Sequence, residues 1–362
     1  MKKYLLIVLF ISLFSISASA QKLGKPSLTA KEPTADQKLL IQQGIELHDE
    51  KNYDEAIKLY QQVLKENPDC DLAIYELAFS YYAKQDFPKA LETAYKLVQY
   101  KGNRGILGFG LLANIVDDQG NPKKAIEIYQ SAIKVLEDDP EYQSHLSSLY
   151  FNLGVTHTRQ KQSKEAREAL KSAVLYDFKY PSPNYLLAEV FYSSKYKIPA
   201  LLAAGRFLTL ELNTNRSNRA TAIFLDILKA AEKDEKGNIQ LFLDLNAPKD
   251  EGDFGAIELF LGTSTAVKSE KDKNKSEAES FADGVDTLIA LLSENKKITS
   301  TFVGKTYLPF MVELKKQGYV KHFAYLILQQ NGNAEAEKWL IDNGPKTLAF
   351  LNWAKSYQPK IK

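Results

Sequence analysis

Apolar residues recur at helical spacing through most of residues 37–214, and short polar stretches interrupt them at regular intervals. Two such stretches are 49–52 and 118–121, which are rich in Asp, Asn, Gln and Gly. A helix with one apolar stripe has to bury that stripe against a neighbour. The pattern therefore predicts a series of amphipathic helices joined in pairs by tight polar turns.

The helix pairs repeat along the chain with a period of about 34 residues. Small residues stand at matching offsets, so Gly44 in a first helix is expected to face Ala56 in its second helix, and Ala78 to face Ala90. Their small size lets the two helices approach closely. A single hairpin cannot bury its apolar face alone, so the units are expected to stack. The five predicted repeats are 37–70, 71–104, 106–139, 147–180 and 181–214.

A short insertion separates the third repeat from the fourth. It begins with Asp139 and Pro140, a capping residue followed by proline. Proline is favoured at the first position of a helix, where its missing N–H costs nothing. The insertion therefore predicts an early start to the next helix.

The repeats resemble the tetratricopeptide repeat family. The resemblance is carried best by Tyr53-Asp54-Glu55-Ala56 through Pro68 and by Leu153-Gly154 through Ala173. It covers residues 37–214 and implies an all-α fold, a right-handed superhelix of helical hairpins. It also implies that the first helices line a concave groove that binds a protein or peptide partner.

The resemblance places an aromatic strip, interspersed with polar side chains, along this groove. Tyrosine buries a large area at low entropic cost and keeps a hydrogen-bonding tip, which suits peptide capture. Two alternatives stay open: the rings pack on neighbouring first helices, or the N-terminal lead-in or the C-terminal tail occupies the groove. The candidate groove residues are His48, Tyr75, Phe79, Tyr82, Asn114, Asp117, Phe151, Arg159, Tyr185, Glu189 and Tyr192.

The first twenty residues have the pattern of a signal peptide. Lys2 and Lys3 precede an uncharged apolar run at 4–14, and small residues then lead to Ala20, where cleavage is expected. The apolar run is short for a membrane span. We therefore expect an exported protein, in the periplasm of a double-membrane bacterium or, alternatively, outside the cell. Residues 21–36 are polar, contain two prolines, and are predicted to be a flexible lead-in.

The remainder of the chain is predicted to be mostly helical. Helical spacing within 215–267 indicates a capping helix, followed by a less regular part with short strands near 239–267. The densely charged stretch 268–280 is predicted to be a solvated loop. Residues 281–362 are predicted to form a helical module that caps the array, with a break near Gly344 and Pro345.

Charge and cysteine content narrow the function. The chain has 47 Lys and Arg residues against 45 Asp and Glu residues, and the excess of two matches Lys2 and Lys3 in the signal peptide. A neutral mature chain gives no support for nucleic-acid binding, which requires a basic surface. The single cysteine, Cys70, rules out an internal disulfide framework, so the core has to supply the stability.

The sequence contains no motif for catalysis, a cofactor or a metal. The four histidines, at 48, 145, 157 and 322, lack metal-ligand spacing, and His157 is expected to pack in the core. We therefore expect a non-enzymatic adaptor without a cofactor. Two rival hypotheses are a structural spacer that assembles with its own copies, and an enzyme or small-molecule binder whose site lies in 240–362. The second hypothesis would bring together Asp283, Glu313, His322 and Trp353.

Overall fold

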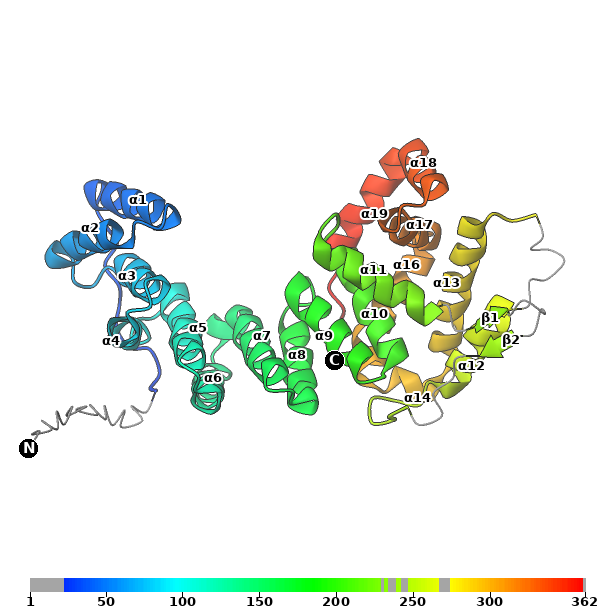
Figure 1. Ribbon diagram of the computed structural model, residues 1–362, viewed down its shortest axis with the longest axis horizontal. Helices are drawn as coiled ribbons and strands as arrows, with labels where there is room; N and C mark the ends of the chain where they lie inside the picture. Colours follow the sequence, from blue (N-terminus) through cyan, green and yellow to red (C-terminus); the bar gives the residue numbers. More distant parts are fainter. Residues whose placement is uncertain (1–22, 229–230, 234–238, 242–246, 267–273, 361–362) are drawn as a thin grey trace, which may run out of the picture.

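The computed structural model describes residues 23–228, 231–233, 239–241, 247–266 and 274–360 (Figure 1). The expected signal peptide, residues 1–20, lies outside the described residues. Figure 1 shows an extended row of helices from α1 to α8, with the remaining helices gathered at the other end. The prediction of an all-α architecture built from helical hairpins is confirmed, with one short two-stranded ribbon added.

Each predicted repeat contains one hairpin of two helices. The second helices are the more amphipathic members, whereas several first helices are buried on more than one side. Asp or Asn side chains cap some of the second helices, as Asp86 does by accepting from Lys89 N–H. The pairs are α1 (Ala35–Asp49) with α2 (Tyr53–Glu66), α3 (Asp71–Ala83) with α4 (Phe87–Leu97), α5 (Asn103–Asp118) with α6 (Pro122–Leu136), α7 (Gln143–Arg159) with α8 (Ser163–Tyr176), and α9 (Pro181–Ser193) with α10 (Lys197–Leu208).

The turn inside every hairpin contains one residue in the left-handed region. Its φ is +67° at Lys51, +65° at Gln85, +58° at Lys161 and +67° at Lys195. Only the third hairpin uses glycine there, Gly120 with φ +81°. A left-handed residue just after a helix lets the chain reverse and satisfy the last carbonyls of that helix. The hairpin geometry is therefore set by the same backbone device in all five repeats.

The close contacts of the first-helix glycines differ from the prediction. A Cβ atom on Gly44 would lie 2.5 Å from Cε1 of Tyr60, and one on Gly154 would lie 2.7 Å from Cγ of Leu170. Gly44 thus makes room for a tyrosine ring rather than for Ala56. The paired alanines at 56, 78 and 90 are themselves fully buried. A large side chain in the second helix fills the space that glycine leaves in the first.

The insertion before the fourth repeat behaves as predicted but in a tighter form. Asp139 accepts a hydrogen bond from the N–H of Glu141, and Pro140–Tyr142 forms one turn of 3-10 helix. Helix α7 follows at once. The Tyr142 side chain is buried, so the insertion is anchored in the core of the array.

The N-terminal lead-in is docked along the array, and the prediction of a flexible segment is wrong for residues 23–34. The N–H groups of Ser27 and Leu28 donate to the carbonyl of Gln99, and the N–H of Lys101 donates to the carbonyl of Leu28, at 2.8–2.9 Å. Farther along, Lys31 N–H donates to the carbonyl of Asp69. These partners lie in the loops that connect consecutive hairpins. We call residues 23–34 the strap; it runs along the loop edge and does not occupy the groove.

The core of the molecule divides within the fourth repeat. One buried cluster extends from Ile41 in α1 to Leu153 in α7 and also includes Ala169 of α8. A second cluster begins with Ala166 and Leu170 in α8, includes the whole fifth hairpin, and continues to Ala354 near the C-terminus. The fifth repeat therefore shares one core with the segments that follow it.

The segment after the repeats is less regular than the repeats. Helix α11 (Asn215–Leu228) lies where the capping helix was expected. A short antiparallel pair follows, β1 (Ala231–Lys233) with β2 (Ile239–Leu241), which agrees with the predicted strand near 239. Within the described remainder of the region expected to hold strands, Gly255–Ala266 forms a helix, α12.

The C-terminal module consists of short helices. The charged stretch predicted as a loop to residue 280 ends earlier, because Ser276 and Glu279 form a capping box that starts α13 at Glu277. The module contains α13 (Glu277–Glu294), α14 (Lys296–Thr299), α15 (Phe302–Thr306), α16 (Leu308–Lys316), α17 (Val320–Gln330), α18 (Ala334–Asp342) and α19 (Gly344–Ser356).

Buried charges attach the segments after the repeats to the array. Arg167 in α8 donates from Nε to Glu251 Oε1 at 3.3 Å, and both side chains are about 5% exposed. The guanidinium carbon of Arg167 lies 4.4 Å from the centroid of the Tyr196 ring. Arg206 in α10 is fully buried between the rings of Phe178 and Phe310, and it donates to the carbonyls of Ala354 and Tyr357. That second joint fixes the C-terminal tail against the fifth repeat, outside the groove. Burial lowers the pKa of Arg206 to about 9.

A candidate binding groove on the first helices

The first helices of consecutive repeats pack against one another, α1 on α3, α3 on α5, α5 on α7 and α7 on α9. They form the inner layer of the array, and residues of α3, α5 and α7 surround a depression in it. A hollow of about 210 Å³ lies there. Its lining residues are Tyr75, Phe79, Tyr82, Ile106, Leu107, Gly110, Leu111, Asn114, His145, Ser148, Leu149 and Asn152.

An aromatic stack forms one wall of this hollow. The rings of Tyr75 and Phe79 lie nearly parallel with centroids 6.2 Å apart, and His48 stacks on the other side at 4.8 Å from Phe79. His48 Nδ1 also lies 2.7 Å from the Ser80 hydroxyl. Burial lowers the pKa of His48, which favours the neutral ring. The stack is thus a preformed, uncharged surface of which Phe79 remains 37% exposed.

The floor of the hollow is open because α5 carries glycine there. A Cβ atom on Gly110 would have only Asn152 Nδ2 nearby, at 3.6 Å. Leu107, one turn earlier on the same helix, is 46% exposed. Asn114 lies one turn later, and its side-chain oxygen accepts from the Tyr129 hydroxyl at 2.6 Å. An apolar surface with amide groups at its edge can bury an apolar side chain and also pair with a peptide backbone.

Three of the predicted groove residues belong to a polar network between helices. The Tyr82 hydroxyl donates to Asp118, and Arg159 donates to Asp117. The Thr156 hydroxyl also donates to Asp117, at 2.8 Å. Tyr82, Asp117 and Arg159 therefore link α3, α5 and α7 at one end of the hollow. They hold consecutive repeats in register as well as bordering the groove.

The predicted residues of the fourth and fifth repeats lie beyond the hollow and already have partners. Phe151 makes an edge contact with Tyr180, with ring centroids 5.5 Å apart. Glu189 accepts from the Tyr185 hydroxyl and from Arg219 of α11 at 2.8 Å. The Tyr192 hydroxyl donates to Asp226 of α11 at 2.7 Å. Helix α11 thus continues the inner layer with a charged surface.

Sequence reasoning missed most of the floor and the far wall of the hollow. Ile106, Leu107 and Leu111 read as ordinary apolar positions of a packed helix, and Ser148 and Asn152 carry no motif. The signal that could have identified the floor is the run Gly105–Gly110, in which three glycines weaken a helix that must still form. His145 is half-buried in the wall, and burial lowers its pKa.

The four residues of the rival C-terminal site have separate surroundings. Asp283 is exposed and pairs with Lys275, and Glu313 accepts from Gln317 at 2.8 Å. Trp353 stacks on Phe310 with ring centroids 5.4 Å apart. His322 is buried in an aromatic environment that includes Trp339. Elsewhere, His157 is buried as expected, with Nδ1 2.6 Å from Gln162 Oε1.

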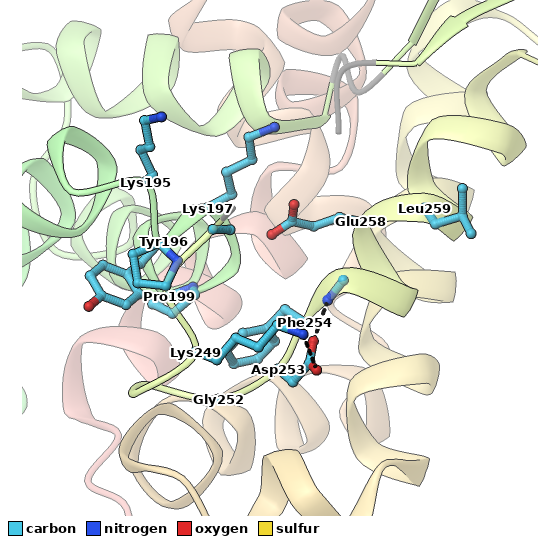
Figure 2. A pocket seen from close by; sticks show the side chains of 13 residues that line it. Lys195, Tyr196, Lys197, Pro199, Lys249, Gly252, Asp253, Phe254, Glu258 and Leu259 are labelled. Atoms are coloured by element: carbon cyan, nitrogen blue, oxygen red, sulfur yellow. Dashed lines mark hydrogen bonds and ion pairs between the residues drawn. The ribbon is translucent and has the colours of Figure 1, made fainter. Parts of the chain in front are cut away.

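A second hollow, of about 190 Å³, lies where the α9–α10 turn meets the segment before α12 (Figure 2). Lys249 pairs with Asp253 at its edge, at 2.8 Å. The Glu258 side chain extends from α12 toward the turn, and the rings of Tyr196 and Phe254 form the walls of the hollow. Cationic and anionic groups are mixed here, which is typical of a joint between segments. We regard the hollow between α3, α5 and α7 as the stronger candidate.

Comparison with known proteins agrees with the hairpin geometry. Two models of the tetratricopeptide repeat match the sequence, one over residues 47–115 and one over 147–180. The chain contains tetratricopeptide repeats. In the described part of the chain, the helices are all too short or too polar to cross a membrane. Among curated proteins, none matches the sequence.

Solved structures of other repeat proteins resemble parts of the chain. TTC0263, a thermophilic tetratricopeptide repeat protein from Thermus thermophilus, is 22% identical with a TM-score of 0.40, covering 52% of this chain and 99% of its own. YrrB, described as a repeat protein with an unusual peptide-binding site, is 17% identical with a TM-score of 0.35, over 51% and 90%. PilW, a type IV pilus biogenesis factor, is 15% identical with a TM-score of 0.39, over 74% and 98%.

Proposed function

We propose that this chain binds a segment of a protein partner in the groove formed by the first helices of its tetratricopeptide repeats. The observation that carries the proposal is the uncharged hollow of about 210 Å³ between α3, α5 and α7. Phe79 and Leu107 expose apolar surface into it, and Gly110 leaves its floor open. Such a concave apolar site with a few polar groups is the usual form of a ligand pocket.

The size and charge of the hollow define what it accepts. An apolar cavity of about 150 Å³ is large enough for a benzene ring, so this hollow can receive one large apolar side chain. Among the described residues, those that line it include no Lys, Arg, Asp or Glu. A charged side chain would lose its hydration there without gaining a counter-ion. The expected partner segment therefore presents an uncharged aromatic or aliphatic residue, and the Asn152 side chain pairs with its backbone.

The action proposed is binding without catalysis, after export. The absence of catalytic motifs in the sequence supports the first part, and the pattern of residues 1–20 supports the second. We place the mature protein in the periplasm of a double-membrane bacterium, with release outside the cell as the alternative. Fractionation of the native host and sequencing of the mature N-terminus test this placement, and a chain that retains Met1 in the cytoplasm contradicts it.

A substitution that fills the hollow tests the binding proposal. Gly110→Leu places a side chain into the open floor and favours the helix, so the chain is expected to stay folded while partner capture is lost. Capture is measured with a photocrosslinking amino acid at Leu107 in the native host, followed by mass spectrometry. The matched control is Gly284→Leu, at a helical glycine of α13 with nothing within 4 Å of its added Cβ. Identical crosslinks in both variants would contradict the proposal.

A combined alanine substitution of the groove tyrosines would be a poorer test. Tyr82 and Tyr192 donate hydrogen bonds to Asp118 and Asp226 on the following first helices. Removing them would loosen the joints between repeats as well as the groove. Tyr75 is the cleaner choice, because its ring contributes to the wall through stacking on Phe79.

A further inference from the structure

His322 occupies an unusual position inside the C-terminal module. Its side chain is 3% exposed, and neither Nδ1 nor Nε2 has a hydrogen-bond partner in the described part of the chain. Buried polar atoms in folded proteins nearly always have such a partner, because an unpaired one loses its hydrogen bonds to water without replacing them. An imidazole without partners is tolerated here only in its neutral form.

The ring lies where three helices of the module meet. Trp339 of α18 is the nearest ring, with centroids 4.8 Å apart. Tyr319, in the turn before α17, lies at 5.9 Å, and Phe350 of α19 lies at 6.2 Å. His322 itself belongs to α17. Its side chain therefore helps to hold the α18–α19 hairpin against the remainder of the module.

The charged groups around His322 are both positive. Lys321 precedes it on α17, and Lys346 approaches from α19. The Lys321 ammonium lies 5.1 Å from the centroid of the Trp339 ring and pairs with Glu279 of α13 at 3.5 Å. From the other elements packed against His322, α18 contributes the uncharged ring of Trp339, and the turn before α17 contributes that of Tyr319. A proton on His322 would thus add a third cation to an apolar site.

We propose that protonation of His322 at acidic pH releases the α18–α19 hairpin from α17 while the five repeats stay folded. The far end of α19 stays attached, because Arg206 donates to the carbonyls of Ala354 and Tyr357. The hairpin therefore swings about this attachment instead of separating completely. Its release exposes the rings of Trp339 and Phe350.

The direction of the pH response follows from linkage. Burial, and then Lys346 and Lys321, lowers the pKa of His322 from 6.5 to about 4 in the closed module. The released hairpin exposes the ring to water, so the released state binds a proton more readily. The closed state is fully favoured above pH 6.5 and loses its advantage as the pH falls toward 4. One proton changes the opening equilibrium by up to about tenfold for each pH unit in this window.

The chain has two tryptophans, and they make the test direct. Trp339 on α18 lies on the proposed moving part, whereas Trp353 lies beside the attachment at the end of α19, so Trp339 is expected to report the release. We expect the full chain to show red-shifted tryptophan emission and greater acrylamide quenching as the pH is lowered from 7 to 4.5. Far-ultraviolet circular dichroism should retain most of its helical signal. His322→Leu should abolish the pH response, whereas His145→Gln, at a half-buried histidine of the array, should keep it.

Several outcomes would overturn the proposal. Tryptophan emission and quenching that do not change with pH would do so, as would an equal response in His322→Leu. Loss of the helical signal together with the tryptophan change would show global unfolding instead of hairpin release. If His322→Leu does not fold, the urea midpoint of the natural chain followed by tryptophan decides. The proposal requires that midpoint to fall steadily between pH 6.5 and 4.5, and a constant midpoint contradicts it.

Discussion

The packing within the hairpins of the array and the joint between the array and the segments that follow it are built in different ways. Neighbouring helices in the array meet through small residues and large rings, as Gly44 meets Tyr60. The segments after the repeats meet the array through buried charged groups, Arg167 with Glu251, and Arg206 with backbone carbonyls. An apolar joint between adjacent helices forms with neighbours in sequence. An ionic joint has to bring together groups 84 residues apart, and it tolerates few other arrangements.

The largest loss of folding stability is expected at the ionic joint between Arg167 and Glu251. Glu251→Ala removes the buried carboxylate partner of Arg167 and leaves it only Asp250, whose side chain is 56% exposed. Removing one partner of a buried pair typically costs about 3–5 kcal/mol, and the remaining Asp250 puts the expected loss at the lower end of that range. Urea denaturation followed by tryptophan emission measures this loss. The double variant Arg167→Met with Glu251→Leu replaces both charges by apolar groups and should recover most of the stability. A loss below about 1 kcal/mol in Glu251→Ala would show that the joint does not depend on the pair.

An intermediate effect is expected at the apolar joint. Gly44→Ala would place its Cβ 2.5 Å from Tyr60 Cε1, so the ring or α1 has to move, at a cost of about 1–3 kcal/mol. Thermal unfolding measured by circular dichroism gives the change. Gly110→Ala is the matched control, because the nearest atom there is 3.6 Å away and alanine should stabilise the helix by up to about 1 kcal/mol. Equal effects at both positions would contradict this account of the hairpin.

The smallest loss of folding stability is expected at an exposed ion pair between the fifth repeat and helix α11. Arg219 of α11 pairs with Glu189 of α9 at 2.8 Å, but its side chain is 50% exposed. Arg219→Ala should therefore reduce stability by less than about 1 kcal/mol. The difference from the natural chain should disappear in 1 M salt, because exposed charges are screened. A larger decrease in the urea midpoint that does not depend on salt would contradict this, because it would show that the Arg219–Glu189 pair stabilises the fold as a buried pair does.

The same contrast explains what could be predicted from the sequence. The hairpins depend on contacts between residues close in sequence, so Gly44, Ala56 and the polar turns indicate them directly. The left-handed turn residues were not predictable by type, since Lys51 and Lys195 are not residues that favour this conformation. The position of α12 was not predictable either, because its apolar residues lack a clear period.

The groove was predicted only in outline. Positions taken from the repeat pattern identified Tyr75, Phe79, Tyr82 and Asn114, which do line the hollow. Arg159 and Tyr192 were predicted to line the groove, and their side chains bond to Asp117 and Asp226 on neighbouring helices. Whether a polar side chain faces solvent or the next repeat depends on the packing of consecutive hairpins. A single sequence contains no direct signal for that packing.

The strap has a consequence for how the molecule carries mechanical load. Its hydrogen bonds to Gln99 and Lys101 run across the loop edge, and its backbone also reaches Asp69. A force applied at residue 23 is therefore shared among the loops of several hairpins before it reaches α1. These bonds use backbone atoms, so the side chain at Leu28 can vary without removing them. When the chain is pulled at residue 23, the strap should therefore detach from the loop edge before the first hairpin opens.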